Sequence, residues 1–174
     1  MTVPEPLSHL FAALASVAEP WRDLYSNSTV VSTGVLFAHI AALVIGGGLA
    51  LTMDGATLRA SRAGVDAAAR GRQLGDLALA HRTVVASLGV VAASGALLFL
   101  ADVEQFAGSW VFWSKMALVA ALLANGYTMT RTERTLAAGI EGAGTRWARL
   151  SAHARVSAAL WLATLLAGTI LSNV

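Results

Sequence analysis

Histidines are the side chains of this sequence best suited to chemistry, because all four lie in or beside apolar segments: His9, His39, His81 and His153. An ionisable group inside an apolar segment is costly and usually faces a protein interior or a site. His81 lies near the start of one apolar segment, and His153 lies at a similar depth at the start of another. Two neutral imidazoles facing each other across a helix bundle typically ligate a haem iron, so this pair predicts a haem b site.

His39 lies at another depth, about 15 residues before the end of its segment, which is roughly 20 Å along a helix. It therefore cannot join His81 and His153 at one small metal ion, which argues against a three-histidine zinc centre. We expect His39 to mark a second, outer site for a haem or a quinone. Met116 is at about the right height to be a metal ligand with His39, and His9 is another candidate partner.

Four stretches of mostly apolar residues are about long enough to span a bilayer: 33–53, 83–101, 110–129 and 153–172. Short connections favour antiparallel neighbours. The predicted fold class is therefore all-α integral membrane, an up-down four-helix transmembrane bundle over residues 33–174. Residues 1–32 form an outer segment. Within it, residues 7–18, between Pro6 and Pro20, are too few to span and are expected to lie as a short interfacial helix.

Composition excludes a soluble domain, because 56% of the residues are apolar and only 13% are charged, against roughly 25% in soluble domains. The lack of cysteine excludes disulfides and thiolate metal sites. Of the 12 basic residues, 10 lie in residues 54–82 and 131–155. The positive-inside rule places both segments in the cytoplasm and both chain ends outside it, in what we expect to be a bacterial inner membrane. The basic charge thus indicates orientation in the lipid bilayer and not a nucleic-acid partner.

Other polar residues of these segments have structural interpretations. Asp54 and Arg59 are expected to form an interfacial salt bridge or to cap a helix end, and Lys115 can extend to the outer surface. Asn125 and Tyr127 are expected to form hydrogen bonds between helices.

Small residues predict close helix packing. They occupy every fourth position from Gly34 to Ala50, which forms a ridge that another helix can approach. Gly46-Gly47-Gly48 would in addition allow the approach of a large planar ligand, or a bend. In the connection 54–82, we expect a turn near Gly64 or Gly71.

The run from Ser26 through His39 to Asp54 and Arg59 resembles uncharacterised bacterial four-helix membrane families. Residues 95–99, 112–116 and Asn125 are similar to the second and third helices of those families. More distantly, the chain resembles copper-resistance D membrane proteins and four-helix b-type cytochromes. The resemblance implies the four-helix fold, and of the histidines it covers His39.

Three functions follow as hypotheses. The first is a small membrane b-type cytochrome, or cytochrome-like subunit, that transfers electrons between a quinone and a redox partner. His81 and His153 would be its axial ligands. The second is a non-catalytic accessory subunit of a larger membrane complex, and a homo-oligomer is also compatible with the small-residue ridges. The third is copper or other metal handling by His39 and the methionines.

Overall fold

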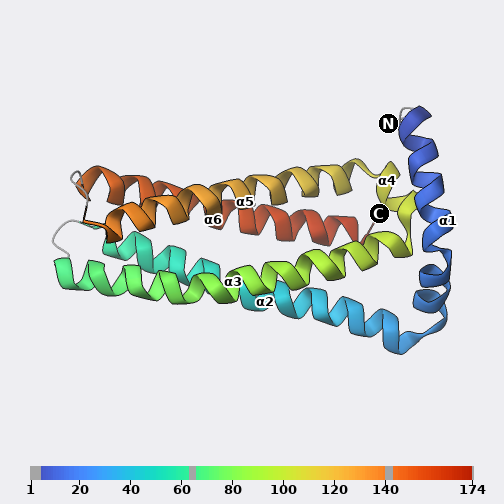
Figure 1. Cartoon of the computed structure of the whole chain (residues 1–174), viewed down its shortest axis with the longest axis horizontal. Helices are drawn as coiled ribbons and strands as arrows, with labels where there is room; N and C mark the ends of the chain where they lie inside the picture. Colours follow the sequence, from blue (N-terminus) through green and yellow to red (C-terminus); the bar gives the residue numbers. More distant parts are fainter. Residues whose placement is uncertain (1–4, 63–65, 140–142, 174) are drawn as a thin grey trace.

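The computed structural model describes residues 5–62, 66–139 and 143–173, and it contains only helices and short connections in these ranges. Four long helices run alongside one another: α2 (Thr29–Ala60), α3 (Ala67–Ala101), α5 (Trp110–Ala137) and α6 (Ala143–Leu171). Two further helices are α1 (Glu5–Asn27) and the short α4 (Val103–Gly108). Figure 1 shows α1 lying across one end of the long helices, near the two chain ends.

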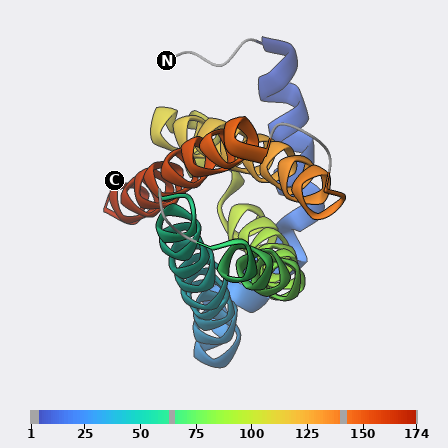
Figure 2. The ribbon, with the colours of Figure 1, turned by 90° about the vertical axis from the view of Figure 1, so that its left-hand side faces the viewer.

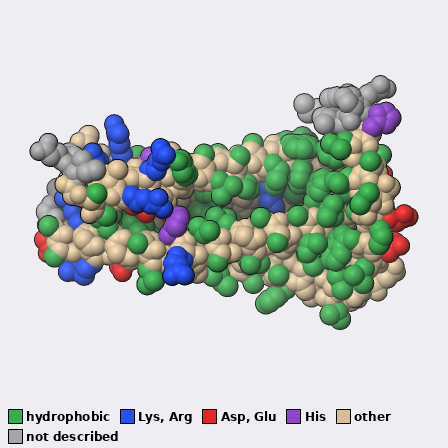
Figure 3. All heavy atoms as spheres, viewed as in Figure 1, with side chains coloured by type: hydrophobic (Ala, Val, Ile, Leu, Met, Phe, Trp, Pro, Cys, Tyr) green, Lys and Arg blue, Asp and Glu red, His purple; other side chains and the backbone are tan. Residues whose placement is uncertain are grey.

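The long helices form two antiparallel hairpins, α2–α3 and α5–α6. The hairpins pack together mainly through α2 and α6, whereas α3 and α5 barely touch. Figure 2 shows this arrangement along the bundle. The side between α3 and α5 is therefore open, and Figure 3 shows the surface hollowed there, with a basic side chain in the hollow.

Three helices are long and apolar enough to cross a bilayer, namely α2, α3 and most of α6. Their outward faces expose large hydrophobic side chains such as Phe37, Val85 and Leu166, which suits contact with lipid. These features indicate a membrane protein. The helix α5 does not meet the same criterion, although it lies against α6.

Helix ends follow ordinary capping chemistry. The hydroxyls of Ser28 and Ser109 accept hydrogen bonds from the first turns of α2 and α5. The carboxylate of Asp66 caps α3 in the same way, so Gly71 lies inside α3 and the turn expected there is wrong. Gly64, the alternative, lies outside the described residues. Gly139 follows α5 with a φ of 68°, the left-handed conformation in which glycine commonly ends a helix.

The N-terminal helix is longer than expected. The helix α1 has 23 residues and continues through Pro20, where the sequence had predicted a helix over residues 7–18. Contacts beyond this proline hold it in place, since Trp21 donates its indole N–H to the Leu97 carbonyl at 2.9 Å and also packs on Tyr25. Tertiary contacts thus offset the hydrogen bond that a proline removes.

A hydrophobic cluster joins the long helices at the end opposite α1. Its buried members are Ala60, Leu77, Met129, Trp147, Leu150 and Ala154. Both arginine-rich connections lie at this end, and Figure 3 shows basic side chains gathered there. The bundle is therefore closed by apolar packing at its basic end.

The glycine triplet is a packing site for two neighbouring helices. A Cβ at Gly46 would lie 2.7 Å from Ser87 Cβ of α3, and one at Gly47 would lie 3.1 Å from the Trp161 indole of α6. Gly48 faces open space. The planar group that approaches this triplet is thus the indole of Trp161, which is itself buried.

Candidate functional site: an outer and an inner polar layer

His39 is 8% exposed, and its Nδ1 lies 2.9 Å from the Ser94 hydroxyl of α3. The Ser94 hydroxyl donates its own proton to the Val90 carbonyl, at 2.6 Å. Ser94 can therefore only accept from the imidazole, so His39 carries its proton on Nδ1. The ring rests on the α3 backbone, because a Cβ at Gly95 would lie 3.3 Å from its Cε1. The imidazole also hydrogen-bonds to the Val91 backbone of α3. Nε2 bonds to no side chain and is the nitrogen that can accept a proton or bind a ligand.

Lys115 of α5 shares this level of the bundle. Gly47 of α2 faces Trp161 of α6. His39 is eight residues from Gly47, and Gly168 is seven residues from Trp161, both toward the end of the bundle near α1. His39 and Gly168 therefore lie at similar heights. The Lys115 ammonium lies 3.6 Å from the place a Cβ would take at Gly168, and it acts electrostatically on His39. Lys115 therefore reaches across to α6 and does not extend to the outer surface as expected.

The charge of Lys115 has no acidic counterpart, since no carboxylate among the described residues pairs with it. One turn from Gly168, the hydroxyl of Thr164 is buried and has no hydrogen-bond partner. An imidazole nitrogen, an ammonium group and an unpaired hydroxyl thus come from α2, α5 and α6. We call His39, Ser94, Lys115 and Thr164 the outer polar layer.

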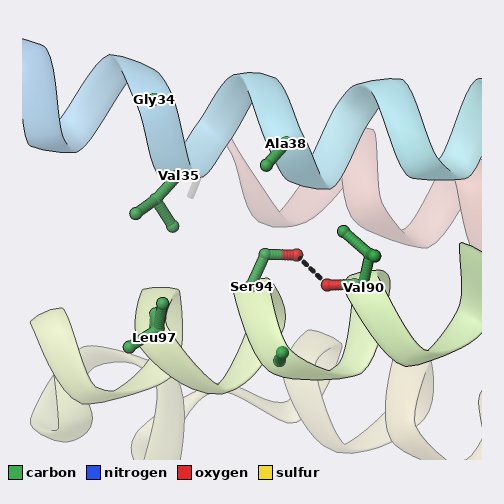
Figure 4. Close-up of a pocket in the computed structure, with 7 residues that line it drawn as sticks. Gly34, Val35, Ala38, Val90, Ser94 and Leu97 are labelled. Atoms are coloured by element: carbon green, nitrogen blue, oxygen red, sulfur yellow. Dashed lines mark hydrogen bonds between the residues drawn. The ribbon is translucent and has the colours of Figure 1, made fainter.

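A groove of about 310 Å³ runs along the seam between α2 and α3, beside this layer. Figure 4 shows Ser94 at its wall, with its hydroxyl bonded to Val90. The other lining residues are apolar or glycine, among them Gly34 and Leu97. Since the one hydroxyl is already bonded, the groove suits an apolar chain and not a polar headgroup.

His153 of α6 is held by α5. Its Nδ1 lies 2.8 Å from Asn125 Oδ1, while the Asn125 amide donates to the His153 carbonyl at 3.0 Å. The expectation that Asn125 bonds between helices is confirmed. Tyr127 is instead 60% exposed and lies under the Arg131 guanidinium of its own helix. The Asn125 contact fixes the orientation of the His153 ring and leaves Nε2 available, as in metal-ligating histidines.

His81 is exposed and lines a cavity of about 190 Å³ between α3 and α5. Glu133 and Arg134 of α5 line the same cavity, but His153 does not. The two histidines predicted to act together are thus on α3 and α6, and this cavity does not unite them.

The inner polar layer comprises Asp54, Thr57, Gln73 and Ser157, and it lies near the hydrophobic cluster. Asp54 is 3% exposed and hydrogen-bonds with Ser157 of α6. Gln73 of α3 donates its amide to the Thr57 hydroxyl at 3.2 Å. The expected salt bridge from Asp54 to Arg59 is wrong, because Arg59 lies exposed beside Gly55.

The remaining candidates lie apart from these layers. Met116 is 36% exposed on α5, and His9 is exposed on α1. Met129 belongs to the hydrophobic cluster and Met53 packs against it, so packing alone accounts for both. In the part of the chain that the structure describes, no three side chains among histidines, aspartates and glutamates gather as a metal-binding group.

Comparison with known proteins gives no family: no family model, curated protein or solved structure matches the chain. The site must therefore be interpreted from its own geometry. Sequence reasoning missed Lys115 and Asp54. The signal for Lys115 was that it is the one basic residue between Arg82 and Arg131.

Proposed function

We propose that the protein is a four-span membrane subunit that binds a quinone between His39 and Lys115 and transfers electrons between it and a redox partner. The observation that carries the proposal is the unpaired ammonium of Lys115 at the level of an imidazole whose Nδ1 is fixed by Ser94. A quinone offers carbonyl oxygens to a donor, and its reduced form offers hydroxyl protons to an acceptor. Lys115 supplies the donor, and His39 Nε2 supplies the acceptor.

The open side of the bundle gives such a ligand a route from the lipid. Because α3 and α5 barely touch, the outer polar layer can be reached from the membrane without crossing a helix pair. A quinone is itself a lipid-soluble molecule, so its headgroup can enter while its chain stays among apolar residues. Lys115 and His39 would then orient the headgroup, and His39 would exchange a proton with it.

The packing of α5 on α6 supports four crossings. The helix α5 lies antiparallel along α6, and its 28 residues would extend about 42 Å, more than the hydrocarbon core of about 30 Å. If α6 crosses the bilayer, its neighbour α5 crosses beside it. The arginine-rich end then faces the cytoplasm, with both chain ends outside.

Haem b is a second candidate, favoured by the hydrogen bond that orients His153. His153 and His81 would hold the iron, and the haem would supply one-electron transfer toward the redox partner. The imidazole donors suit this group. The 190 Å³ cavity beside His81 lies below the usual 300–1,000 Å³ of ligand pockets, so a porphyrin requires a wider separation of α3 and α5 than this structure has. A reduced-minus-oxidised spectrum without a Soret band, even after haem supplementation, rules this candidate out.

A quinone titration of the purified protein in lipid nanodiscs tests the main proposal. Decylubiquinone should quench the tryptophan fluorescence saturably. Lys115→Met keeps the length of the side chain but removes the charge, and should weaken binding by about tenfold or more, as expected for a lost hydrogen bond from a charged donor. Arg131→Met, an exposed charge on the same helix, is the matched control. Equal affinities of all three proteins would contradict the proposal.

A further inference from the structure

Asp54 is the most deeply buried ionisable side chain among the described residues, and its Oδ2 has no hydrogen-bond partner. The Asp54 carboxyl group hydrogen-bonds with Ser157 of α6, which is also buried. Thr57, one turn farther along α2, is completely buried, and its hydroxyl already accepts a hydrogen bond from the Gln73 amide of α3. The carboxyl group therefore lies in a polar layer between three helices, with one oxygen unused.

No cation neutralises this carboxyl group. On its own helix, Arg59 is exposed beside Gly55. On α3, Arg70 donates to the Ala60 carbonyl and lies over the Trp147 ring of α6. On α5, Arg134 acts on Glu133. On α6, His153 lies one turn from Ser157, and its Nδ1 bonds to Asn125 of α5. Asp54 makes no ion pair in the described part of the chain.

An ionised carboxylate buried without a neutralising cation costs far more free energy than the neutral acid, and the cost is greater inside a membrane bundle. We propose that Asp54 is a proton-binding site of the bundle interior, loaded from the basic end of the molecule through Glu133.

Glu133 provides the connection to water. It is half-buried on α5, lines the cavity with His81 and Arg134, and interacts electrostatically with Asp54. Its carboxylate accepts a proton from water entering the cavity. The proton then moves through water to the Asp54 carboxylate, because α2 and α5 do not touch, and release follows the reverse order. Only the proton moves, so no oxidant or other reactant is needed.

This site does not rest on the proposed quinone site. Asp54 and His39 are 15 residues apart on α2, about 22 Å at 1.5 Å per residue. Failure of quinone binding leaves the proton site intact, and the two experiments have separate readouts.

Infrared difference spectroscopy of the full chain in liposomes tests the site. At pH 5 the spectrum should contain the C=O band of a protonated carboxyl group, which disappears as the pH rises above 7. The band should be absent from Asp54→Asn and kept by Asp76→Asn, an exposed acid on α3. The same band in Asp54→Asn, or its appearance only below about pH 4 as for an ordinary exposed acid, would overturn the proposal. Removal of the band by NaCl at constant pH would show a cation site in place of a proton site.

Two further variants keep the test decisive if Asp54→Asn does not fold. Ser157→Ala removes the hydrogen bond to the acid and should shift the band, whereas Ser151→Ala, a buried serine of the same helix that bonds to Ala148, should not. Glu133→Gln should keep the band but slow its exchange with D₂O by roughly tenfold or more, because a proton relay is lost. An unshifted band in Ser157→Ala contradicts the assignment of the band to Asp54. Unchanged exchange in Glu133→Gln contradicts the proton route through Glu133.

Discussion

The indole of Trp161 lies on the backbone of Gly47, with Cε3 and Cζ3 at 3.1 and 3.2 Å from the place a Cβ would take. This contact joins α6 to α2 midway between the outer and inner polar layers. It also sets the relative heights of His39 on α2 and of Gly168 on α6, beside which the Lys115 ammonium lies.

Gly47→Ala should destabilise the protein by about 1–3 kcal/mol, because the added methyl group overpacks the contact with Trp161. Thermal unfolding in detergent measures the effect. Gly48→Ala is the matched control, since nothing lies within 4 Å of its Cβ position, and it should be neutral or slightly stabilising. Equal losses in both variants would show that helix flexibility, and not the Trp161 contact, requires the glycines.

The pair Asn125 and His153 should contribute measurably to the packing of α5 on α6. Asn125→Ala removes two hydrogen bonds between α5 and α6 and leaves His153 Nδ1 only its 3.5 Å contact with the Thr128 hydroxyl, which should cost about 1–3 kcal/mol. Asn125→Asp should cost less at a pH where the new acid is protonated, because its C=O can still accept from His153 Nδ1 and its O–H can replace the lost amide donor. Unfolding curves of both variants measure these losses of stability. An Asn125→Ala protein as stable as the wild type would contradict the contribution of the pair.

Glu133 gives the stability a pH dependence. Burial, and next the nearby Asp54, raise the pKa of Glu133, and Arg134 opposes this in part. A raised pKa means that the folded state binds the proton more tightly. This contribution to stability is complete below the ordinary pKa of about 4.3 and is lost as the pH rises through the raised value. Chemical unfolding across that range should show stability falling with rising pH in the wild type and a weaker fall in Glu133→Gln. The same slope in both proteins would remove Glu133 as its cause.

The number of crossings can be decided with single cysteines, because the chain has none of its own. Four crossings predict that a membrane-impermeant thiol reagent labels Asn173→Cys in intact cells, but Ala138→Cys only after permeabilisation. If α5 stayed outside the membrane, the connection after it and the chain end would exchange sides. The opposite labelling pattern at these two positions, with the α2–α3 connection still inside, would therefore show three crossings.

The long helices could be predicted from continuous apolar runs, and their shared basic end from the arginines. The ridge from Gly34 to Ala50 was only partly correct, because steps of four residues advance 40° beyond a full turn. Ala42 and Gly46 are buried, but no atom of another helix lies within 4 Å of the place a Cβ would take at Gly34. A true interior stripe alternates steps of three and four.

The candidate site depended on contacts between helices, which spacing along one chain cannot reveal. The burial of Asp54 requires Ser157, more than 100 residues away in the sequence, and the orientation of His153 requires Asn125 of the preceding helix. His39 was predicted to be a site residue from its depth alone. Lys115 was not, because a lysine near a helix end can extend to the surface, and only the neighbouring helices show that it reaches α6 instead.

Photolabelling with an azido-quinone in liposomes tests the central claim most directly. The account predicts that the label attaches to the outer halves of α2, α5 and α6 around His39 and Lys115, that unlabelled quinone competes for it, and that Lys115→Met reduces it. Labelling spread over the lipid-facing surface of the helices, without competition and unchanged in Lys115→Met, would contradict a quinone site in this bundle.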